Sequence, residues 1–146
     1  MILNKDFREF IELLNSNKVR YLIVGGYALA LHGHPRYTKD LDIWIWISEE
    51  NAENLIKSLQ DFGFSALDLS KDDFLTPGIV VQLGYPPQRI DILTQATGVD
   101  FEECYASRVE LVADGLKMDF IDFENFKKNK KATGRLQDLA DLESLR

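Results

Sequence analysis

The sequence predicts an α/β (α+β) fold in which a mixed β-sheet is flanked by helices. Helical and strand patterns alternate in the first half of the chain, as they do where helices connect the strands of a sheet. Strand patterns in the second half are separated by short turns, which is typical of antiparallel pairing. A length of 146 residues, with no internal repeat and no linker, favours one domain over residues 1–146.

The first half of the chain begins with an amphipathic helix. Apolar residues at helical spacing predict this helix over residues 4–16, and the apolar run 19–24, which ends at a double glycine, predicts a buried strand. A short helix over 27–32 follows and stops at a glycine, with a proline beyond it. β-branched and aromatic residues predict a strand over 41–47, and a serine cap precedes a helix over 51–62.

The second half of the chain is richer in strands. Apolar, β-branched residues predict strands over 79–83 and 89–93. An Asp-Gly pair at 114–115 is a strong hairpin signal, and it joins predicted strands over 109–112 and 116–121. Helices are expected in three further places: 101–107, 123–131 and 135–145.

Composition and charge exclude several classes of protein. The net charge of −7 argues against binding of nucleic acid as a polyanion, although a local cationic pocket for one nucleotide is compatible with it. No apolar run approaches the roughly 20 residues of a membrane span, so no membrane partner is expected. The one cysteine, Cys104, cannot form an internal disulfide, so we expect a cytoplasmic protein in which Cys104 is inert packing.

Two aspartates open the apolar strand DLDIWIWI, which starts at Asp40. Alternate residues of a strand share a face, so Asp40 and Asp42 project together with Trp44 and Trp46. Neighbouring carboxylates repel each other, and a divalent cation between them removes that cost. Two carboxylates plus phosphate oxygens are the ligands that magnesium usually takes. A tryptophan on this face could stack on a base or a partner, or it could belong to the core.

A third acid, Asp91, lies in another apolar strand. If the two strands are neighbours, the three carboxylates converge and could hold two metal ions for in-line phosphoryl or nucleotidyl transfer. The structural alternatives are a solvated turn or a cap for Asp40 and Asp42, and an ion pair with Arg89 for Asp91.

The double glycine, Gly25-Gly26, stands between a predicted strand and a short helix. Glycines let the backbone approach a ligand closely, and the N–H groups at a helix start attract phosphate. The alternative is a tight turn from strand to helix that binds nothing. No Gly-Lys-Ser/Thr follows the glycines, so this is not a Walker A loop.

These features occur together in the order GGxAxxxHGxxRxTxDLDI, from Gly25 to Ile43, and are followed by the strand with Asp91. In this order the chain resembles the nucleotidyltransferase superfamily of the DNA polymerase β type, and within it the small members grouped with AbiEii-type toxins. Its ending RLQDLADL, residues 135–142, is similar to an Arg-x-x-Asp-Leu-x-Asp-Leu stretch of those members. The resemblance covers most of the chain.

The resemblance implies a role for each residue of the motif. Gly25 and Gly26 would seat the triphosphate of a nucleotide. The catalytic and metal-binding acids would be Asp40, Asp42 and Asp91, which would hold two Mg²⁺ (or Mn²⁺) ions. Asp91 would also be the natural base for the attacking hydroxyl.

Basic residues are the remaining candidates, because lysine and arginine clamps neutralise a triphosphate and its leaving group. Arg36 could reach a phosphate or pair with an aspartate, and Thr38 lies between Arg36 and the acids in the same nucleotide-binding motif. His32 and His34 are too close together for a helical metal pair, so we interpret them as helix-end residues. A basic cluster near the C-terminus could clamp phosphates or form a solvated helix face: Lys127, Lys130, Lys131 and Arg135.

Three functional hypotheses follow. The first is a metal-dependent nucleotidyltransferase that moves a nucleoside monophosphate from a nucleoside triphosphate, most simply ATP, to an acceptor hydroxyl on a protein, an RNA end or a small molecule. The second is a non-catalytic domain that keeps the fold and binds a nucleotide or a partner protein, such as a cognate toxin or antitoxin. The third is a structural domain with solvated acids. The presence of all three acids favours the enzyme.

Overall fold

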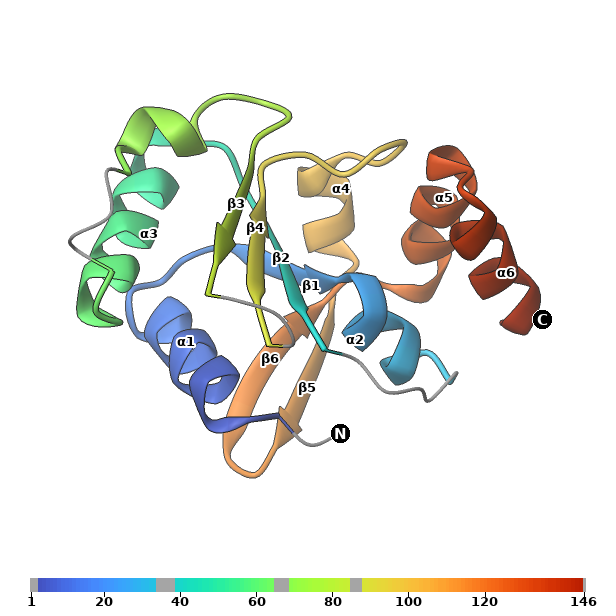
Figure 1. Ribbon diagram of the computed structural model, residues 1–146, viewed down its shortest axis with the longest axis horizontal. Coiled ribbons are helices and arrows are strands. Elements are labelled where there is room, and N and C mark those ends of the chain that lie inside the picture. Colours follow the sequence, from blue (N-terminus) through green and yellow to red (C-terminus); the bar gives the residue numbers. More distant parts are fainter. Residues whose placement is uncertain (1–2, 34–38, 65–68, 85–87, 146) are drawn as a thin grey trace.

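A six-stranded mixed sheet runs through the centre of the molecule (Figure 1). The computed structural model describes residues 3–33, 39–64, 69–84 and 88–145. The strands are β1 (Tyr21–Val24), β2 (Leu41–Ile45), β3 (Val80–Leu83), β4 (Ile90–Leu93), β5 (Val109–Ala113) and β6 (Leu116–Phe120). The helices are α1 (Lys5–Ser16), α2 (Gly25–Leu31), α3 (Glu49–Asp61), the 3₁₀ helix η1 (Lys71–Phe74), α4 (Phe101–Ala106), α5 (Phe123–Thr133) and α6 (Leu136–Ser144).

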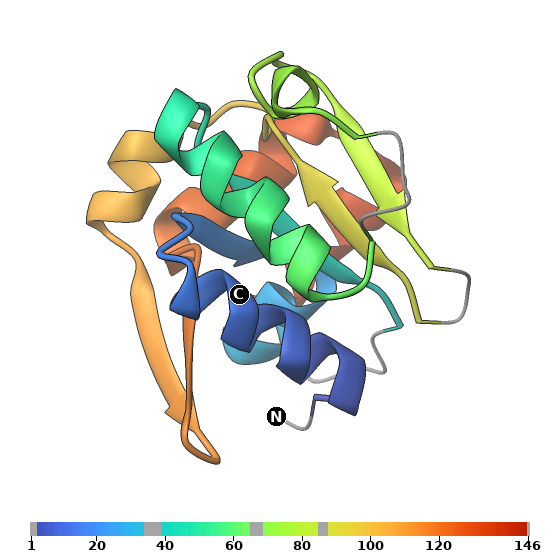
Figure 2. The same cartoon turned by 90° about the vertical axis from the view of Figure 1, so that its left-hand side faces the viewer.

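The strand order is β3-β4-β2-β1-β6-β5. The pairs β2/β4 and β1/β6 are parallel, and the other neighbouring pairs are antiparallel. Helices α1 and α3 cover one face of the sheet, while α5 and α6 lie beyond the other face (Figure 2). The predicted fold class, a mixed sheet flanked by helices, is confirmed.

Side-chain caps fix where several helices begin. The Asn4 side chain accepts a hydrogen bond from the backbone N–H of Phe7 at 2.8 Å, and α1 starts there. The Ser48 hydroxyl accepts from the N–H of Asn51 at 3.1 Å and starts α3, as the sequence predicts. Each cap satisfies a backbone donor that has no partner within its own helix.

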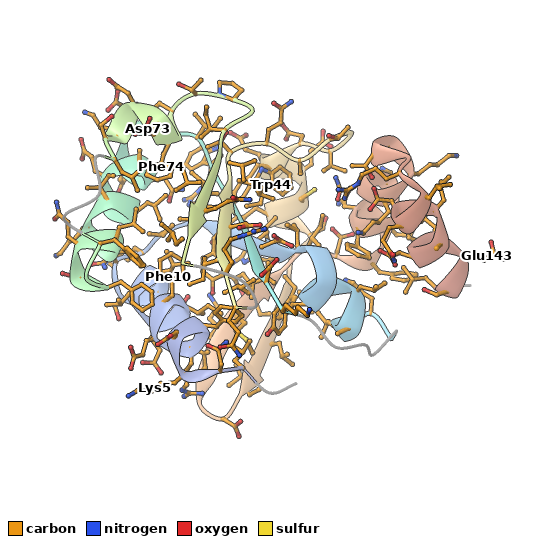
Figure 3. The ribbon with its side chains drawn as sticks, viewed as in Figure 1. Lys5, Phe10, Trp44, Asp73, Phe74 and Glu143 are labelled. Atoms are coloured by element: carbon orange, nitrogen blue, oxygen red, sulfur yellow. The ribbon has the colours of Figure 1, made fainter. Side chains whose placement is uncertain are left out.

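The hydrophobic core lies between the sheet and its helices. Phe10 of α1 and Phe74 of η1 are both fully buried, and Figure 3 shows them on the side of the sheet where α1 and α3 lie. Trp44 is also buried and packs edge-on against Phe101 at 5.1 Å between ring centroids, so the core interpretation of this tryptophan is confirmed. Trp46 is half-buried, with the guanidinium of Arg20 over its ring at 4.9 Å.

The predicted elements are found with bounds within two residues of the predicted ones; α2, for example, begins at Gly25, two residues before its predicted range. The 3₁₀ helix η1 was not predicted, because a four-residue element shows no apolar periodicity. None of the helices in the described parts of the chain has the length and apolar character to cross a membrane.

Candidate active site

Asp42 and Asp91 lie side by side at the start of two parallel strands. Asp42 of β2 is in register with Asp91 of β4, so both side chains leave the same face of the sheet. Asp40 directly precedes β2. The structure therefore brings together the acids that the sequence places far apart, and it does so through the parallel pairing of β2 with β4.

Asp42 is a carboxyl in an unfavourable place for charge. Burial first, and then the negative charges of Asp91 and Asp40, raise its pKa to about 7. The positive charges of Lys130 and Arg89 act in the opposite direction. A carboxyl whose pKa lies near neutral pH is typical of functional sites.

Gly25 packs directly against Asp42. Val24 and Asp42 are partners across the antiparallel pair β1/β2, and the chain turns at Gly25 with φ at +68°. A Cβ atom at this position would collide with the Asp42 carboxylate. Glycine is thus required here by close approach as well as by backbone conformation. Gly26 follows as the second residue of α2.

Arg89 holds the other two acids. Its Nε donates to Asp91 Oδ1 at 2.7 Å, and its Nη2 donates to Asp91 Oδ2 at 3.0 Å. The same Nη2 lies 3.4 Å from Asp40 Oδ2. The predicted ion pair between Arg89 and Asp91 is confirmed, and Arg89 extends it to Asp40.

The three acids offer the chemistry that a magnesium ion needs, since hard carboxylate oxygens on a partly buried surface repel one another until a cation joins them. Burial is the main cause of the raised pKa of Asp42, and repulsion from Asp91 and then from Asp40 adds to it. Within the described residues, however, no three His, Cys, Asp or Glu side chains are arranged to share one cation. The guanidinium of Arg89 lies between Asp40 and Asp91 instead.

Helices α5 and α6 contribute a buried cation to this side of the molecule. Lys130 is 8% exposed, and its Nζ lies 3.1 Å from Asp138 Oδ1 and 3.2 Å from Asp141 Oδ2. The charge of Lys130 is felt at Asp42, where it lowers the pKa. Two acids of α6 therefore hold Lys130 in place while its charge acts on Asp42.

Asp138 is the centre of this ion network. Burial alone would raise its pKa, but hydrogen bonds from Arg135, Thr133 and Lys130 hold the pKa of Asp138 well below its usual value. Arg135 binds it through Nε at 2.7 Å, and the Thr133 hydroxyl donates to it at 2.6 Å. Asp138 thus anchors α6 to the end of α5.

The four cations of the C-terminal cluster have different surroundings in the structure. Lys127 pairs with Glu124 at 3.2 Å, and Lys131 is exposed on α5. Lys130 is buried and Arg135 is bound to Asp138, so these two are the members tied to the site. Sequence reasoning did not single out Lys130. The available signal was the helical spacing that places Lys130 on the same face as the buried Phe126.

Arg36, Thr38 and His34 lie outside the described residues. His32 caps the end of α2, and its Nε2 lies 2.8 Å from the carbonyl oxygen of Ile121, as expected for a helix-end residue. Cys104 is buried, and this burial is the main reason why the pKa of its thiol is raised to about 12. The expectation that Cys104 is inert packing agrees with this environment.

Several solved structures share this fold. A candidate nucleotidyltransferase from Thermotoga maritima (TM1012) is 19% identical, with a TM-score of 0.61 over 96% of this chain and 88% of that one. An antigenic nucleotidyltransferase-like protein from Paracoccidioides brasiliensis is 21% identical, with a TM-score of 0.56 over 98% and 77% of the two chains. The lincosamide antibiotic adenylyltransferase LnuA, in its lincomycin-bound structure, is 17% identical, with a TM-score of 0.56 over 99% and 96%.

Identities at this level establish the fold. A search of curated proteins found no match. A family model gives a more direct assignment, because it matches residues 3–146, which include the whole glycine and aspartate motif. The predicted membership of the nucleotidyltransferase superfamily is thereby confirmed. The chain belongs to the family described as "Nucleotidyltransferase of unknown function (DUF6036)".

Proposed function

We propose that the protein is a metal-dependent nucleotidyltransferase that moves a nucleoside monophosphate from a nucleoside triphosphate, with ATP as the first candidate, to an acceptor hydroxyl. Family membership supports nucleotidyl transfer as the reaction class. The observation that carries the proposal is the register of Asp42 with Asp91 beside the Gly25 turn, since it puts paired carboxylates next to a backbone that can approach a ligand.

Asp40, Asp42 and Asp91 are the residues that would hold Mg²⁺ or Mn²⁺. When bound, the metal supplies positive charge to the phosphate oxygens at which negative charge develops. Gly25 and Gly26 would seat the triphosphate at the start of α2. The hydroxyl of Thr38 and the cations Arg36, Lys130, Lys131 and Arg135 would bind its phosphates.

The reaction breaks one bond and forms one. The acceptor oxygen attacks the α-phosphorus in line, the bond from that phosphorus to the bridging oxygen of the β-phosphate breaks, and pyrophosphate leaves. Asp91 accepts the proton of the acceptor hydroxyl. Lys130, held by two carboxylates of α6, adds positive charge near the reacting phosphates.

The acceptor is a protein, an RNA end or a small molecule, and a cognate toxin or antitoxin is the partner that the proposal includes. LnuA is an adenylyltransferase of an antibiotic, which makes a small hydroxylated molecule one acceptor class to test. A second candidate function is a non-catalytic domain that binds a nucleotide or a partner. It is favoured by the bonds of Arg89 to Asp40 and Asp91, which satisfy both acids without a ligand.

The test is nucleotide binding in a Gly26→Asp variant. We expect calorimetry with a non-hydrolysable ATP analogue and Mg²⁺ to show affinity reduced by roughly tenfold or more, because a new carboxylate would repel the phosphates. Gln60→Asp is the control. It makes the same charge change at an exposed position of α3, outside the candidate site, and affinity should not change. A folded Gly26→Asp protein with wild-type affinity would show that the glycines are only a turn.

A further inference from the structure

The guanidinium of Arg89 uses the carboxylate oxygens that a cation would need. Both oxygens of Asp91 accept from it, at 2.7 Å and 3.0 Å. On Asp40, Oδ2 faces Nη2 at 3.4 Å, while Oδ1 accepts from the backbone N–H of Arg89 at 3.2 Å. One residue thus occupies the oxygens of two of the three acids through charge-assisted hydrogen bonds.

The backbone and the side chain of Arg89 are fixed to different degrees. The backbone lies at the start of β4 beside β2, where its carbonyl accepts from the N–H of Leu41 at 2.9 Å. The side chain is 24% exposed, which is more than the 11% of Asp91. The guanidinium can therefore rotate into solvent about its own side-chain bonds without crossing the core and without disturbing the pairing of β2 with β4.

A guanidinium and a divalent cation compete for the same carboxylate oxygens, because both are positive and repel each other across a shared carboxylate. We propose that Arg89 is a built-in counter-ion of the acid cluster, which a divalent cation must displace from Asp91 and Asp40 in order to bind. This inference rests on the proposed function, since it concerns the same acids. It assigns to Arg89 a role that limits metal affinity and stabilises the metal-free protein.

The first experiment compares metal affinity in two variants. In Arg89→Gln we expect Mn²⁺ binding, measured by calorimetry, to tighten by about tenfold, because the ion no longer displaces a charged hydrogen-bonding partner. In Arg89→Lys the charge stays but the forked contact is lost, so the affinity should fall between those of wild type and Arg89→Gln. The melting temperature of metal-free Arg89→Gln should be lower than that of wild type, and the rise caused by Mn²⁺ should be larger.

Arg108 provides a matched control at another edge of the sheet. It is 26% exposed and pairs with Glu110 at 3.0 Å and with the buried Asp119 at 3.6 Å. Arg108→Gln should lower the melting temperature of the protein and leave Mn²⁺ affinity unchanged. The comparison separates the loss of any paired arginine from the loss of the one at the acid cluster.

The second experiment follows Arg89 itself in the wild-type protein. A guanidinium Nε–H bonded to a carboxylate is protected from exchange with water, and its NMR signal can be assigned by its absence in Arg89→Lys. Saturation with Mg²⁺ should remove this protection. Persistent protection with Mg²⁺ bound would overturn the displacement of Arg89.

The outcomes distinguish this inference from the proposed function. Wild-type protein that binds Mn²⁺, together with an Arg89→Gln variant of equal or weaker affinity, would overturn the counter-ion role alone, because Arg89 would then position Asp91 for the metal. Absence of Mn²⁺ binding in wild type and in Arg89→Gln would overturn the proposed metal site and the counter-ion role together.

Discussion

At the second position of β2, Asp42 combines burial with two acidic neighbours, and its pKa rises to about 7 for these reasons, burial first. A carboxyl whose pKa is higher in the folded than in the unfolded protein binds its proton more tightly when folded. Its contribution to stability is therefore full at low pH and is lost as the pH rises toward about 7. Above that range the ionised carboxylate of Asp42 destabilises the metal-free folded protein.

Asp42→Asn removes this cost. At about pH 8 we expect the metal-free variant to melt at the same temperature as wild type or higher. Mg²⁺ should raise the melting temperature of wild type, since a ligand at a hundredfold excess over its Kd stabilises by about 2.7 kcal/mol. Asp42→Asn should abolish this rise, as measured by thermal melts with and without metal.

Asp6→Asn, at an exposed position of α1, makes the same chemical change away from the site and should keep the response to metal. If Asp42→Asn melts well below metal-free wild type and neither protein responds to metal, Asp42 is a structural aspartate and the enzyme proposal fails.

At the scale of elements, α5 and α6 form a helical pair held together by buried ions. Asp138 accepts from Lys130, Thr133 and Arg135, and Gly134, with φ at +66°, turns the chain between the helices. The opposite side of α6 is apolar and exposed at Leu136 and Leu139. Charge at Asp138, more than apolar burial, therefore fixes where α6 lies.

Asp138→Asn should destabilise the protein by roughly 2–4 kcal/mol near neutral pH, because Lys130 stays buried with one acid fewer. Hydrogen bonds hold the pKa of Asp138 below its usual value despite burial. The contribution of Asp138 to stability is therefore complete at a pH above the usual pKa of an aspartate, and it is lost as the pH falls through the lowered pKa of the folded protein. The gap in unfolding free energy between wild type and variant should thus shrink on acidification below about pH 4. Denaturant titrations across this range measure it, and a gap that stays constant would contradict the ion network.

Local signals in the sequence were sufficient for most elements. Ser48 marked the start of α3, and Asp114-Gly115 marked the β5–β6 hairpin, where both residues have positive φ as this turn requires. The 3₁₀ helix η1 was missed because its capping residues, Ser70 and Asp73, act over a single turn without a periodic apolar face.

The sequence predicts the acids of the candidate site and the ion pair of Arg89 with Asp91, but it does not predict the rest of their surroundings. Asp42 and Asp91 stand out because charge is unusual in an apolar strand, but their register depends on pairing between distant segments. The roles of Lys130 and Asp138 depend on how α6 packs against α5, which no local pattern specifies. Arg89 was visible as a neighbour of Asp91, yet its bond to Asp40 exists only because β4 lies beside β2.

At the scale of the whole molecule, the sheet places the acids on its inner strands. β2 and β4 lie between the edge strand β3 and the rest of the sheet, and β5 forms the other edge. The residues of β1 are all buried, whereas Val80 of β3 and Val112 of β5 are more than half exposed. Acids on inner strands have a rigid backbone, which suits a site that must hold a fixed geometry.

Amide hydrogen exchange should be slower in the inner strands of the sheet than in the edge strands. We expect the slowest amide exchange in β1 and β2, intermediate exchange in β4, and the fastest exchange among the strands in β3 and β5, because edge amides open without breaking the core. Mass spectrometry of exchanged peptides measures the ranking. Protection of β5 equal to that of β2 would contradict it and would indicate that another chain pairs with this edge.

The position of Lys130 has a consequence for the order in which the site is made during translation. Residues 123–146 contain more lysine and arginine than aspartate and glutamate, so the segment synthesised before them is more acidic than the −7 of the whole chain. Synthesis runs from the N-terminus, so Asp40, Asp42 and Asp91 are made before the cations of α5 and α6. Arg89 emerges almost together with Asp91, which lets the nascent strands β2 and β4 pair without waiting for the C-terminal helices.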